Sequence, residues 1–220
     1  MIEHADFGAL AEALAAEMAR ALARALDRDG RAAMALSGGR TPGPILDRLS
    51  RADLDWSRVQ VMATDERWVA EDDPRSNAGL IRARLMTGPA AAARLVPLAD
   101  AGTTPEAGAA ALEDGVRAAL PLTVVLLGTA PDMHTASLFP GAAGLEAALR
   151  GPRALLPIHA EQAPEPRVTL SAPVLGAAEA IFLVITGQEK RAAVARAGDL
   201  PAEEAPIGLF LPRARIHWAP

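Results

Sequence analysis

The chain has 220 residues, enough for one sizeable domain (1–220) with a substantial core, and half of its residues are apolar. It has no cysteine, which excludes disulfides, zinc–thiolate sites and thiol catalysis, and its net charge of −5 is spread along the chain, so no nucleic-acid-binding face is expected. No apolar run approaches the ~20 residues of a membrane span and the first ten residues lack a signal-peptide pattern, so we expect a cytoplasmic protein that binds no membrane; no oligomeric state is indicated.

Helices and strands are expected to alternate along the chain. Leucine and alanine at helical spacing predict a long amphipathic helix over about 6–26. Further on we expect strands at 32–36, 59–63, 122–127, 180–186 and 214–218, and helices over 45–49, 76–85, 105–120 and 188–196. This alternation indicates an α/β fold with a largely parallel sheet covered on both faces. Residues 142–166 are the least regular segment and are expected to form an excursion over the site.

The first strand-end loop whose residues could bind a ligand is SGGRTP at 37–42. Paired glycines, Gly38 and Gly39, let backbone N–H groups converge just before a helix, which suits an anion. Ser37 precedes them, Arg40 offers a planar cation and Thr41 a hydroxyl, both good phosphate partners. The spacing is neither that of a P-loop nor that of a dinucleotide-binding fingerprint. An ordinary tight turn remains an equal alternative for this loop taken alone.

The second loop, TDERW at 64–68, also follows a strand. An acidic pair beside an arginine is usually a surface ion pair. Because strand ends face the ligand-binding crevice in α/β sheets, Asp65 is instead expected to hold a sugar hydroxyl and Arg67 to reach a phosphate.

The third loop follows the apolar run at 122–127 and contains His134. An imidazole at this position can act as a general base near neutral pH. Asp132 lies two residues earlier, where a turn lets its carboxylate fix the ring's tautomer. We expect Thr135 to cap a short helix. With no nucleophile beside a base of its own, the chain favours attack by activated water over a covalent intermediate.

Two later segments add cations. Arg167 opens a strand-like stretch, PRVTL. Lys190, the only lysine, falls in the first turn of a helix, where a cation is unfavourable unless an anion lies nearby. Plain solvation is the alternative for both.

Taken together, these segments resemble the glucosamine-6-phosphate isomerase/6-phosphogluconolactonase family, and within it the 6-phosphogluconolactonases. The resemblance covers about residues 30–195 and rests on LSGGRTP (36–42), DERWV (65–69), DPRSN (73–77), LLGTAPDMHTASLFPG (126–141), PRVTL (166–170) and TGQEKR (186–191). It implies a three-layer αβα sandwich of the sugar-phosphate isomerase/deaminase type. It also implies hydrolysis of 6-phospho-D-glucono-1,5-lactone to 6-phosphogluconate in the pentose phosphate pathway, without a cofactor or metal.

By this resemblance His134 is the base that activates water, and Asp132 supports it. The implied contacts to phosphate and sugar oxygens come from the 38–41 loop, Arg67, Arg167 and Lys190. Three residues depart from the family's usual pattern. Ala130 and Met133 replace glycines, and Arg40 replaces a serine. Met133 disfavours a positive φ, so the loop geometry or the substrate fit is expected to differ.

Two alternative functions fit less well. Glucosamine-6-phosphate deaminases share the fold, but they typically continue H-I-A-F-N-E-P, and the acidic residue of that motif has no counterpart in HTASLFP at 134–140. A non-catalytic sugar-phosphate sensor would not need the pair formed by Asp132 and His134, and the chain has no spare length for a DNA-binding module.

Overall fold

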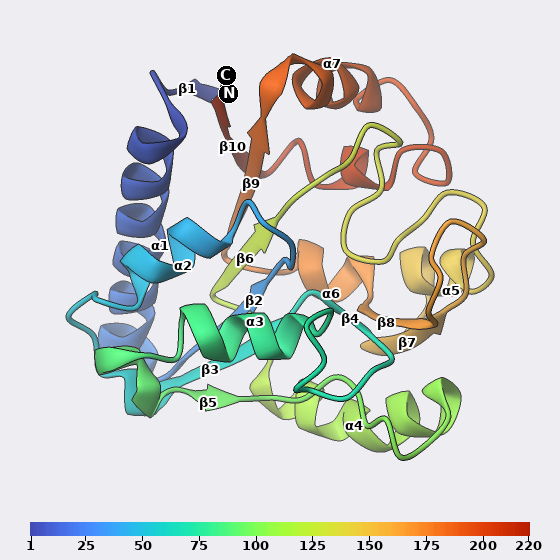
Figure 1. Ribbon diagram of the computed structural model, residues 1–220, viewed down its shortest axis with the longest axis horizontal. Helices are drawn as coiled ribbons and strands as arrows, with labels where there is room; N and C mark the ends of the chain where they lie inside the picture. Colours follow the sequence, from blue (N-terminus) through green and yellow to red (C-terminus); the bar gives the residue numbers. More distant parts are fainter.

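The structure, a computed structural model, describes residues 1–220, and its centre is a seven-stranded sheet in the order β1-β10-β9-β6-β2-β3-β5 (Figure 1). Every neighbouring pair in this sheet is parallel. The strands are β1 (Ile2–Glu3), β2 (Ala32–Leu36), β3 (Val59–Ala63), β5 (Arg94–Leu95), β6 (Val124–Leu127), β9 (Ala180–Thr186) and β10 (Ala214–Ala219). The predicted α/β fold is confirmed. The two strands that were not predicted, β1 and β5, are two-residue strands at the sheet edges.

Helices cover the sheet on both sides. They are α1 (Phe7–Asp29), α2 (Gly43–Leu49), α3 (Asn77–Arg84), α4 (Pro105–Ala119), α5 (Leu145–Arg150), α6 (Ala172–Gly176) and α7 (Gly187–Ala197). In Figure 1, α1 and α2 lie on one side of the sheet and α5 to α7 on the other. The first helix begins where the Asp6 side chain accepts from the Ala9 amide, and it ends at Gly30, whose φ of 71° is left-handed.

A second, three-stranded antiparallel sheet was not predicted. It consists of β4 (Asp65–Arg67), β8 (Arg167–Leu170) and β7 (Leu155–Ile158) in the order β4-β8-β7. The predicted loop at 64–68 therefore contains a strand, and the segment 142–166, which was predicted to be irregular, contains α5 and β7. Strand β4 consists only of charged residues, so it exists through pairing with β8 and not through local propensity.

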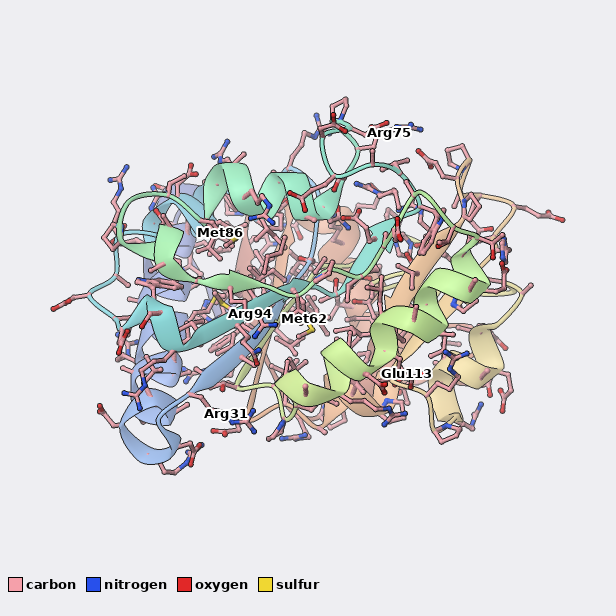
Figure 2. All side chains as sticks on the ribbon, turned by 90° about the horizontal axis from the view of Figure 1, so that it is seen from below. Arg31, Met62, Arg75, Met86, Arg94 and Glu113 are labelled. Atoms are coloured by element: carbon pink, nitrogen blue, oxygen red, sulfur yellow. The ribbon has the colours of Figure 1, made fainter.

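Helix α4 anchors the small sheet. The Glu113 carboxylate accepts from the Ala154 amide at 2.7 Å and from Arg153 Nε at 2.9 Å, just before β7 begins. Figure 2 shows Glu113 on this helix. A continuous core of 62 buried residues joins both sheets and their helices. None of the helices is both long and apolar enough to cross a bilayer.

Candidate active site

A cleft of about 470 Å³ opens beyond the carboxyl ends of β2, β6 and β9 and against the second sheet. This is the side of an open parallel sheet where ligands bind, and the volume suits a small molecule. The cleft wall includes every residue predicted for the site except Asp132: Ser37, Gly38, Gly39, Arg40, Thr41, Asp65, Arg67, His134, Arg167 and Lys190. Parallel strands bring these segments together because their carboxyl ends share one edge.

The imidazole of His134 is oriented by two neighbours. Its Nδ1 lies 2.7 Å from Asp132 Oδ1, as predicted, and the same oxygen accepts the His134 amide at 3.3 Å. The ring of Phe139 packs against it with 4.5 Å between centroids. A carboxylate at Nδ1 favours the tautomer that is protonated there, which leaves Nε2 as a proton acceptor.

The His134 turn differs from its prediction in two respects. Thr135 does not cap a helix. It pairs with Leu138 in a tight turn, and its hydroxyl donates to the Gly128 carbonyl at 2.8 Å. Met133 adopts a φ of 65° in spite of its side chain, and Ala136 a φ of 50°. Hydrogen bonds hold this left-handed conformation, because the Met133 amide donates to Ala130 at 2.9 Å and its carbonyl accepts from Ile207 at 3.2 Å.

The three charged side chains of β4 alternate between the two faces of the strand. Asp65 and Arg67 line the cleft, whereas Glu66 between them is buried on the opposite face. Glu66 accepts from the amides of Asn77 and Ala78 and thereby caps α3. Burial raises the pKa of Glu66, and the hydrogen bonds that it accepts oppose this rise. The predicted role of a cleft residue therefore suits Asp65 and Arg67 but not their neighbour.

Two arginines face each other across the small sheet. Arg67 on β4 is the register partner of Arg167 on β8, so two cations lie opposite each other. Burial, followed by the charge of Arg67, lowers the pKa of Arg167. The Nε of Arg167 is buried without a hydrogen-bond partner, and its nearest carboxylate, Glu165, lies 3.8 Å from Nη2. Like charges opposite each other destabilise a sheet, so this pair is suited to an anion bound between them.

The segments that follow β2 and β9 supply further polar groups. Lys190 lies on the first turn of α7, as predicted, and lines the cleft. The Ser37 hydroxyl is buried without a partner at the mouth of the glycine loop. The cleft therefore holds four cationic side chains against one carboxylate, that of Asp65. No three His, Asp or Glu side chains are grouped so that they could hold a metal ion.

Comparisons with known proteins match this geometry. The family model described as glucosamine-6-phosphate isomerases/6-phosphogluconolactonase matches residues 5–218. The chain belongs to this family. A 6-phosphogluconolactonase of Rhizobium meliloti is 45% identical, with 96% of this chain and 95% of the relative covered, and one of Pseudomonas aeruginosa is 43% identical, with 96% and 90% covered. The crystal structure of a 6-phosphogluconolactonase from Shewanella baltica superposes with a TM-score of 0.96 at 32% identity, covering 100% of this chain and 97% of that one.

In this member of the glucosamine-6-phosphate isomerase/6-phosphogluconolactonase family, sequence reasoning missed three buried residues that shape the cleft. Ser137 donates from its hydroxyl to Asp65 Oδ2 at 2.5 Å, Phe139 packs on His134, and Asn77 contacts Arg67. All three lie within motifs that carry the resemblance, HTASLFPG and DPRSN. Their roles depend on contacts with distant segments, and 72 residues separate Ser137 from Asp65. Membership of a motif was the only available signal.

Proposed function

We propose that the protein hydrolyses 6-phospho-D-glucono-1,5-lactone to 6-phosphogluconate, the lactonase step of the pentose phosphate pathway, and that it does so in the cytoplasm. The observation that carries the proposal is the His134–Asp132 pair at the wall of a cleft with four cationic side chains. The names of the relatives support the same reaction for this chain.

In the proposed mechanism His134 acts as the general base. Its Nε2 takes a proton from water while the water oxygen forms a bond to the lactone carbonyl carbon C1. The carbonyl oxygen gains negative charge, which a cation of the cleft stabilises. The ring bond from C1 to O5 then breaks, and the proton on His134 passes to O5, leaving a carboxylic acid that ionises. Asp132 stabilises the imidazolium that exists between the two proton transfers.

The phosphate group supplies binding energy away from the reacting carbon. We assign the phosphate to the cationic wall, which includes Arg67, Arg167 and Lys190, and the glycine loop offers it backbone N–H groups. Asp65, which lies in the same cleft, accepts hydrogen bonds from Thr64 and Ser137 and can accept another from a sugar hydroxyl. The positions of these groups suit a phosphorylated polyhydroxy ester.

The decisive experiment measures 6-phosphogluconate formation from freshly prepared lactone above its spontaneous hydrolysis. We expect the wild type to accelerate it and His134→Ala to lower kcat by roughly 10²–10⁴ with little change in KM, the usual effect of removing a general base. His159→Ala is the matched control, because His159 is exposed and bonds Glu106 instead of lining the cleft. An unchanged kcat in His134→Ala would refute the base, and release of ammonia from glucosamine 6-phosphate would favour a deaminase.

A further inference from the structure

Asn77, the only asparagine of the chain, is buried, and its side chain lies against strand β4 and the glycine loop of the cleft. It is the first residue of α3 and follows the helix cap, Ser76. Its side-chain Oδ1 accepts from Arg67 Nη1 at 2.9 Å, and its Nδ2 donates to the Asp65 carbonyl at 2.7 Å. Both contacts fix the orientation of the amide, because the reverse orientation would place its N–H groups against the guanidinium.

The partners of Arg67 leave its charge uncompensated. Besides Asn77 Oδ1, the guanidinium donates to the carbonyl of Arg75 at 2.5 Å. Arg75 lies in the loop between β4 and α3, which stands out from the molecule in Figure 2. Both acceptors are neutral oxygens, and Arg67 forms no ion pair, whereas Arg75 itself pairs with Asp73 and Glu165. Neutral acceptors hold the guanidinium in place while its full charge remains available to an anion.

The same amide also requires a glycine in the anion-binding loop. A Cβ atom added to Gly38 would lie 1.8 Å from Asn77 Oδ1. Gly38 has no positive φ in this structure, so the close approach of the amide, and not backbone conformation, accounts for glycine at this position. The side-chain oxygen of Asn77 therefore lies against both the glycine loop and Arg67, which are neighbours in the cleft wall.

We infer that Asn77 is a positioning residue that fixes the Arg67 guanidinium at the cleft wall without neutralising it, so that Arg67 binds the phosphate of the substrate. This inference rests on the proposed function for the identity of the anion. It assigns to Asn77 an effect on the binding of phosphorylated ligands that passes through Arg67.

The test replaces the amide with a carboxylate of the same shape, Asn77→Asp, which pairs with Arg67 and cancels its charge. We expect KM for the phosphorylated lactone to rise about tenfold, equivalent to one charged hydrogen bond, with kcat within about twofold of the wild type. In an Arg67→Ala background the same substitution is expected to change KM by less than about twofold, because its target is absent. Ser76→Ala, which removes the helix cap but does not contact Arg67, is the matched control for damage to α3.

Two further measurements keep the outcome decisive. If Asn77→Asp fails to fold, Asn77→Ala serves instead. It is expected to raise KM about threefold and to make Gly38→Ala tolerable. Calorimetric binding of inorganic phosphate to wild type and variants is independent of turnover, so a protein without lactonase activity would refute the proposed function alone. An unchanged KM and phosphate affinity in Asn77→Asp, or an equal loss with and without Arg67, would overturn the inference.

Discussion

Replacement of Arg167 by methionine is expected to stabilise the ligand-free protein while weakening the enzyme. Arg167 is half-buried, its Nε atom is buried without a hydrogen-bond partner, and it lies opposite Arg67 across the sheet. A buried unsatisfied donor costs about 1–3 kcal/mol, and like charges facing each other in a sheet cost up to about 1 kcal/mol more. Methionine fills a similar volume without a charge.

The expected gain in the free energy of unfolding is reduced because Arg167→Met loses a weak contact with Glu165. Glu165 lies 3.8 Å from Arg167 but remains paired with Arg75 at 2.5 Å, so it is not left without a partner. We therefore expect Arg167→Met to raise the free energy of unfolding by about 1–2 kcal/mol. For a chain of this length each kcal/mol corresponds to a rise in Tm of about 2–4 °C. In the same variant, kcat/KM for the phosphorylated lactone is expected to fall by about 10² because the charged contact that we propose between Arg167 and the phosphate is lost.

The assay is thermal and urea unfolding with and without inorganic phosphate, together with lactonase kinetics. Phosphate is expected to raise the Tm of the wild type more than that of Arg167→Met, because the ligand stabilises only the state that binds it. Arg51→Met, at an exposed arginine without a side-chain partner, is the control for the change in net charge. A variant that is less stable than the wild type in the absence of phosphate would refute the argument that the arginine pair is a strained anion site.

Two other predictions concern the His134 turn and the pH dependence of stability. At Met133, whose φ is 65°, Met133→Gly is expected to change the free energy of unfolding by less than about 1 kcal/mol. The β-branched Met133→Val is expected to lower that free energy by about 1–2 kcal/mol and to lower kcat. Equal stabilities of the two variants in urea would contradict this prediction. Burial, aided by the charges of His4 and Arg215, lowers the pKa of His217 to about 4. Between about pH 6.5 and 4 the unfolded chain then binds a proton that the folded chain does not, so the free energy of unfolding is expected to fall by up to about 3 kcal/mol over this range and to be unaffected by His217 above pH 6.5. In urea unfolding, His217→Leu should reduce the dependence of this free energy on pH in that range. An unchanged dependence on pH would show that other groups are responsible.

The sequence by itself determined the main sheet and the convergence of the site. Apolar runs predicted the bounds of β2, β3 and β9 as the structure has them, and those of β6 within two residues, because buried parallel strands need continuous apolar stretches. Since the carboxyl ends of parallel strands share one edge, the loops after β2, β6 and β9 had to meet. The pairing of Asp132 with His134 was also predictable, because they lie two positions apart in one turn.

Only the tertiary structure decided how the second sheet forms and how the cleft is held. Strand β4 forms by pairing with β8, about a hundred residues later in the chain, so no local sequence pattern predicts that Arg67 and Arg167 lie opposite each other. The left-handed conformation of Met133 is held by two hydrogen bonds, one within its own turn and one from the distant Ile207, against the preference of its own side chain. Asn77 and Ser137 acquire their roles through contacts with Arg67 and Asp65 that exist only in the folded chain. Local sequence encodes the burial and conformational preferences of single segments, whereas the pairing of charges across a cleft depends on which segments the fold places opposite each other.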